Sequence, residues 1–212
     1  DVASIYRYNY VSSPVNTVGS NDFTLKEVLK DGSSTTSNNS TPLDINFIGG
    51  FDGNAETNPI SIAEYWVYTF ASADGTRSNY KQQKSTGVIP ETDGFLLKGP
   101  GVSQNYTFAG TPKDGNLSTN VGGGESYLVG NPYASALSSK KFIEDNINSI
   151  DGTLYFWEHA GETSTEEENA GHSYAGYVGG YSTRNISMGL SANQVSSNNN
   201  TNNNTPRIGE GS

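Results

Sequence analysis

Short runs in which apolar and polar residues alternate, each ended by turn-forming residues, recur along this chain. Residues 5–11 alternate and stop at a Ser-Ser-Pro turn, and residues 43–48 alternate and stop at a Gly-Gly pair. Alternation at period two is typical of a strand with one face against a core. Further β-type runs occupy residues 65–70, 94–99, 105–108, 126–129, 153–157 and 180–186. This spacing predicts an all-β fold built from many short strands.

The composition agrees with that class and limits the size of the core. Only 33% of the 212 residues are hydrophobic, while 25 Gly and 13 Tyr favour turns and pleated surfaces. We expect a single jelly-roll-like β-sandwich over residues 1–212, a length that one all-β domain can reach. One or two short helices are expected, at residues 23–29 and 138–147. The Asn/Thr tract at residues 196–205 is expected to be a low-complexity loop or linker.

Charge and cysteine content narrow the classes of partner. The 12 basic residues against 22 acidic ones give a net charge of -10, which disfavours binding to nucleic acid. The absence of Cys excludes disulfides and thiolate metal sites. No apolar run approaches the length of about 20 residues that spans a bilayer, so membrane insertion is not expected. Ca²⁺ is an open option, because oxygen ligands are plentiful although no spacing orders them.

The residues that could support catalysis do not form a recognisable pattern. No Ser stands in a Gly-x-Ser-x-Gly turn, and only His159 and His172 could serve as bases. Glu158 follows four bulky apolar residues, so it is a candidate general acid or ligand contact, or a strand-end Glu held by hydrogen bonds. A zinc site from these three residues and Glu166–Glu168 lacks a short fixed spacing. We therefore expect no enzymatic activity, and no catalytic residue is assigned.

The aromatic residues suggest more specific chemistry. Tyr and Trp rings alternate with Asn, Gly and Asp, and flat rings cover the C–H faces of sugars while polar groups bind the hydroxyls. Most Tyr residues of β-proteins nevertheless only pack, with the hydroxyl at the rim. The predicted ligand-binding residues are two Trp and two Tyr for stacking and two polar neighbours, namely Trp66, Trp157, Tyr177, Tyr181, Glu158 and His159.

The order of several motifs is similar to that of a known protein region. The motifs are Tyr10–Val15, Gly94–Gly99, Gln104–Gly115, Tyr127–Leu137, Gly152–His159 and Gly179–Thr183. Together they resemble the region upstream of the C-terminal type IX secretion sorting domain in large secreted and cell-surface proteins of Bacteroidetes, especially flavobacteria. The resemblance implies an extracellular or cell-surface location and a role in adhesins or polysaccharide-degrading systems. The start at Asp1, without Met, agrees with a piece of a longer precursor.

Two functions follow as hypotheses. The first is a non-catalytic module that binds a polysaccharide or surface glycan, or mediates adhesion. The alternative is a structural spacer or filament subunit that binds copies of itself or neighbouring domains.

Overall fold

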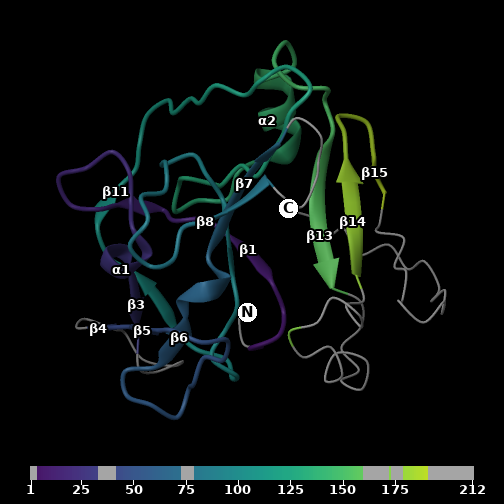
Figure 1. Cartoon of the computed structure of the whole chain (residues 1–212). Coiled ribbons are helices and arrows are strands. Elements are labelled where there is room, and N and C mark those ends of the chain that lie inside the picture. The colour runs from purple at the N-terminus through teal and green to yellow at the C-terminus, as the bar shows by residue number, and fades with distance from the viewer. Residues whose placement is uncertain (1–3, 33–41, 73–78, 160–171, 173–178, 191–212) are drawn as a thin grey trace. The chain divides into compact units, whose positions relative to one another are not determined.

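Figure 1 shows the fold of this protein as a computed structural model. The structure describes residues 4–32, 42–72, 79–159, 172 and 179–190. The chain divides into an N-terminal unit, Asp1–Ala134, and a C-terminal unit, Ser135–Ser212. The predicted loop or linker at residues 196–205 lies outside the described residues.

The expected all-β class with short helices is confirmed. The strands of the N-terminal unit are β1 Asn9–Val11, β2 Val15–Asn16, β3 Leu29–Asp31, β4 Leu43–Asp44, β5 Asn46–Ile48, β6 Ser61–Ala63, β7 Tyr68–Ser72, β8 Tyr80–Gln82, β9 Phe95–Leu97, β10 Tyr106–Phe108, β11 Thr111–Pro112 and β12 Ser126–Tyr127. The helical segments of this unit are α1 Leu25–Val28 and a 3-10 turn, η1 Glu64–Trp66. The C-terminal unit contains α2 Ser139–Asp145, β13 Leu154–His159, β14 Gly179–Arg184 and β15 Gly189–Leu190.

Most strand pairs of the N-terminal unit are antiparallel and short. In its described part, β1, β9, β7 and β12 pair in that order, and β8 also pairs with β7. A second sheet has the order β10-β3-β4, β11 pairs with β2, and β5 pairs with β6 in the parallel direction. The runs 94–99 and 105–108, which follow one another in the sequence, therefore contribute strands to different sheets. The jelly-roll arrangement stays a prediction.

The predicted strand at residues 65–70 begins later than its composition suggests. Tyr65 and Trp66 lie in the 3-10 turn η1, which closes with a bond from the Val67 N–H to the Glu64 carbonyl oxygen of 3.3 Å. The turn lets Trp66 bury its ring, whereas an aromatic run by itself indicates a strand. The helix predicted at residues 138–147 is present as α2. Ser138 is its N-cap, and its Oγ accepts a hydrogen bond from the Lys141 N–H.

The core of the N-terminal unit is formed by apolar side chains from the helix and from several strands. Phe23 and Phe95 lie at its centre, with ring centroids 6.0 Å apart. Phe23 and Ile89 exchange two backbone hydrogen bonds of 3.0 and 2.8 Å, which hold the segment before α1 against the loop before β9. The other members are fully or almost fully buried and include Leu25, Val28, Leu29, Ile62, Val67 and Leu97.

The Gly-Asn-Pro turn at residues 130–132 packs closely against the segments that contain Ser12 and Asp93. A Cβ on Gly130 would lie 2.7 Å from the Asp93 carbonyl oxygen and 2.8 Å from the Ser12 Cβ, so only Gly fits there. The Gly130 N–H donates to the Thr92 carbonyl oxygen at 2.8 Å, and the Ser12 Oγ donates to the Asn131 carbonyl oxygen at 2.8 Å. The motif at residues 130–132 thus has a structural reason that is independent of any ligand.

Replacement of Phe95 by Ala should lower the free energy of unfolding by about 3–5 kcal/mol, because it removes a fully buried ring and leaves a cavity. The measurement is urea denaturation followed by Trp fluorescence. The control is Val88→Ala, which changes an exposed side chain and should alter stability by less than about 0.5 kcal/mol. Equal effects of the two substitutions would contradict the assignment of the core.

Candidate aromatic binding face

Two long strands of the C-terminal unit position the candidate binding residues. β13 and β14 are the adjacent long arrows in Figure 1, with β15 beside β14. They pair antiparallel over six residues, from Leu154 opposite Arg184 to His159 opposite Gly179. β13 forms because its residues are almost all bulky, aromatic or apolar, which suits a pleated strand. Six continuous pairs fix the register, so the side chains on each face are determined by position.

One face of this sheet carries three aromatic rings. Residues two apart on a strand share a face, and directly paired residues share it across strands. Tyr155 and Trp157 therefore lie on the same side as their partners Thr183 and Tyr181. On β15, Leu190 pairs with Thr183 and extends that side. We call this surface the aromatic face, formed by Tyr155, Trp157, Tyr181, Thr183 and Leu190.

Much of the aromatic face is open to solvent. Tyr155 is 62% exposed, Leu190 56% and Tyr181 46%. Trp157 is half-buried and forms an edge-on contact with Tyr181, with ring centroids 5.1 Å apart and planes at 69°. Large exposed apolar surfaces on a folded protein mark sites of interaction more often than chance would give.

The opposite face of the same sheet has a different character. It carries Glu158, half-buried opposite Gly180, and Arg184 opposite Leu154. Ser182 is buried there, and its Oγ donates to the Phe156 carbonyl oxygen at 3.3 Å. The charged residues of the paired strands thus lie on this side. Glu158, which the sequence predicted to contact the same ligand as Trp157, points away from the aromatic face.

The structure brings together two of the six predicted ligand-binding residues. Trp157 and Tyr181 are cross-strand partners on the aromatic face. His159 ends β13, but its side chain lies outside the described residues, as does Tyr177. Tyr155 was not selected from the sequence, although its position two residues before Trp157 on a predicted strand was a usable signal.

Trp66 occupies a different environment, in the N-terminal unit. It is buried, and its Nε1 donates to the Phe51 carbonyl oxygen at 2.6 Å. Its ring makes edge-on contacts with Tyr65 and Tyr8, with centroids 4.7 and 5.6 Å away. These contacts favour the packing role that the sequence left as the alternative to stacking on a ligand.

A buried lysine is held against the Trp66 ring. Lys98 follows β9 and is only 2% exposed, and its Nζ lies 3.7 Å from the centroid of the Trp66 ring and 4.3 Å from that of Tyr8. Ring faces attract cations, so the two aromatic residues partly offset the loss of hydration. Burial lowers the pKa of Lys98 to about 8, and the charge of Asp52 acts in the opposite direction.

The described residues do not support a metal site. No group of three or more His, Asp or Glu side chains converges within the described part of the chain. Glu166–Glu168, which the sequence grouped with Glu158 and the two His residues, lie outside that part. Among the helices of the described residues, none is long and apolar enough to cross a membrane.

Comparison with known proteins places the chain in a family. The model of a family described as a domain of unknown function, DUF8693, matches residues 2–212. The chain belongs to this family. No curated protein and no solved structure matches the chain. The match to DUF8693 covers both units, and the family description assigns neither an activity nor a ligand.

The buried Lys98 predicts a pH dependence of stability. Between the folded pKa of about 8 and the ordinary value of 10.5, the unfolded chain binds more protons at this residue than the folded chain does. The contribution of Lys98 to the free energy of unfolding is therefore lowest below pH 8 and rises with pH through this window. Wild type should gain stability relative to Lys98→Met when the pH is raised from 7.5 to 10.

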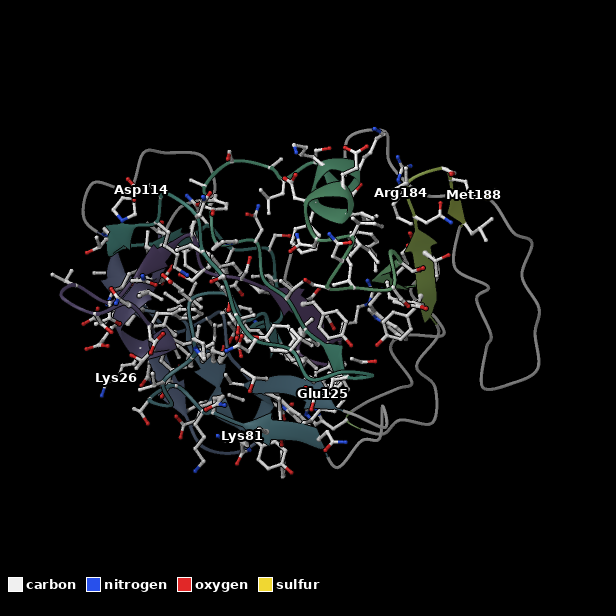
Figure 2. All side chains as sticks on the ribbon, turned by 90° about the horizontal axis from the view of Figure 1, so that it is seen from above. Lys26, Lys81, Asp114, Glu125, Arg184 and Met188 are labelled. Atoms are coloured by element: carbon white, nitrogen blue, oxygen red, sulfur yellow. The ribbon has the colours of Figure 1, made fainter. Side chains whose placement is uncertain are left out.

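This change can be measured by urea denaturation across that pH range. Lys81→Met is the matched control, because it removes a lysine of the same length that is exposed on β8 (Figure 2). A difference between wild type and Lys98→Met that stays constant from pH 7.5 to 10 would show that burial does not shift this lysine.

Proposed function

We propose that this chain is a non-catalytic module of a secreted or cell-surface bacterial protein and that it binds glycans through the aromatic face. The resemblance to regions upstream of type IX sorting domains supports the location. The observation that carries the binding role is the arrangement of three rings on one exposed side of a paired strand. The paired strands already hold these rings in place. Rings on a loop that folds only on binding would lose conformational entropy when the ligand binds, which would weaken the affinity.

The chemistry of the aromatic face suits a sugar. The rings of Tyr155, Trp157 and Tyr181 offer apolar faces to the C–H groups of a pyranose. The hydroxyls of the two tyrosines and of Thr183 can both donate and accept hydrogen bonds, as sugar hydroxyls do. Because β13 and β14 hold these groups in a six-residue register, little ordering is needed when a ligand binds.

Affinity electrophoresis in gels that contain polysaccharides tests the proposal. Wild type should be retarded by at least one glycan, and Tyr155→Ala should weaken binding about tenfold, since loss of a ring contact costs up to about 1.5 kcal/mol and about 1.4 kcal/mol is a factor of ten in affinity. Tyr155→Phe keeps the ring and should retain most of the affinity. Tyr155 suits this test better than Trp157, because the Trp157 ring packs against Tyr181 and its removal would also take away a contact between β13 and β14.

The matched control is Phe156→Ala. Phe156 is the next residue on β13, is 40% exposed and faces the opposite side. Its loss should leave glycan retention unchanged if the aromatic face is the site. Equal mobility of wild type and Tyr155→Ala in every gel, with folding confirmed by circular dichroism, would refute the proposal.

A second candidate function rests on exposed apolar residues around the β14–β15 turn. Ile186 and Met188 lie in that turn, Leu190 follows on β15, and all three are exposed; Figure 2 shows Met188 next to Arg184. Such a patch suits self-association of a spacer or filament subunit.

If this patch is an assembly surface, sedimentation velocity should show larger species as the protein concentration rises, and Met188→Lys should abolish them by burying a charge in the contact. Val18→Lys, at an exposed site of the N-terminal unit, is the control and should assemble like wild type. A monomer at all concentrations would refute the assembly role.

A further inference from the structure

We infer that the aromatic face takes a single chain of an uncharged polysaccharide, in preference to an anionic chain or to the flat surface of a crystalline polysaccharide. The inference rests on the proposed glycan-binding function and specifies its substrate class. Two independent properties of the face carry it, namely the relative orientation of its rings and the lack of charged groups among its described side chains.

The ring orientation is incompatible with a flat solid. A crystalline polysaccharide surface is planar, so several rings must lie in nearly one plane to stack on it together. The planes of Trp157 and Tyr181 cross at 69°. When one of these rings lies flat against a sugar, the other presents its edge. A single glycan chain can satisfy both rings, because successive sugar residues rotate about their glycosidic bonds and present different faces.

The positions of the rings extend the contact beyond one sugar. Tyr155 and Trp157 are two residues apart on β13, which places their backbones about 6.6 Å apart along the strand. Tyr181 lies across the strand pair from Trp157, at a ring centroid distance of 5.1 Å. The three rings are thus spread along and across the strand pair, which favours an oligosaccharide or a chain over a single monosaccharide.

The charge pattern disfavours anionic glycans. Sulfates and carboxylates are bound by Arg and Lys, which form charge-assisted hydrogen bonds with them. The described residues of the aromatic face are Tyr, Trp, Thr and Leu, and the one Arg of β14, Arg184, lies on the other side with Glu158. The net charge of -10 adds a repulsion toward polyanions. The hydroxyls of the face suit neutral hydroxyl groups instead.

The experiment compares three classes of ligand with the full chain. Soluble neutral polysaccharides (mixed-linkage glucan, xylan and glucomannan) and anionic ones (alginate and carrageenan) are used in affinity gels at low salt. Microcrystalline cellulose and chitin are used in pull-down assays. We expect retention by at least one neutral soluble polysaccharide, weakened about tenfold in Tyr155→Ala, and no retention by the anionic or crystalline ligands.

A charge added to the face provides the matched variant. Leu190→Lys places a cation at an exposed position of the aromatic face, whereas Met188→Lys places the same charge in the neighbouring turn. Retention on alginate should appear with Leu190→Lys and be smaller with Met188→Lys, because Leu190 pairs with Thr183 within the aromatic face whereas Met188 precedes β15 in the turn.

The outcomes separate this inference from the proposed function. Retention of wild type by alginate, carrageenan or a crystalline solid, lost in Tyr155→Ala, would overturn the substrate class and leave glycan binding at this face intact. Absence of retention in all three classes would refute both. Retention by neutral chains that Tyr155→Ala does not weaken would place glycan binding elsewhere and overturn the inference about this face.

Discussion

The antiparallel pairing of β13 with β14 is the constraint on which the candidate site depends. Each strand alone would expose its side chains on both sides, with no fixed relation between distant parts of the chain. Six continuous residue pairs bring Trp157 opposite Tyr181 and set Tyr155 on the same side. The same register sends Glu158 and Arg184 to the other side. A slip of one residue would exchange the two faces and remove the ring cluster.

The N-terminal unit depends on a different balance, in which a modest apolar core coexists with a buried cation. Phe23 and Phe95 supply the large buried surfaces at the centre of the core. Lys98 is buried beside the rings of Trp66 and Tyr8. Its pKa is lowered because burial removes hydration from the ammonium group, and the charge of Asp52 offsets this effect only in part. The buried Trp66 ring therefore packs around the Lys98 ammonium group, although by residue type Trp66 was as good a candidate for stacking on a ligand as Trp157.

Local sequence pattern predicted the parts of the fold that local physics controls. Short β-type runs between turn residues identified the regions of most strands, and a Ser followed by a helix-forming segment located α2 with Ser138 as its N-cap. It failed at Tyr65 and Trp66, where an aromatic-rich run forms a 3-10 turn because burial of the Trp ring outweighs strand preference. It also could not show that the neighbouring runs ending at Gly99 and beginning at Asn105 supply strands to different sheets, since pairing joins residues that are distant in the chain.

The sequence by itself determined the all-β class, the acidic character and the presence of aromatic residues suited to stacking. These properties follow from composition and from periodicity over a few residues. Only the tertiary structure decided which rings lie together, because cross-strand register and burial depend on contacts between distant segments. In the tertiary structure Trp157, Tyr181 and Tyr155 share one face of the β13–β14 pair, and Glu158 lies on the opposite face. Trp66 is buried instead, with its ring against the ammonium group of Lys98.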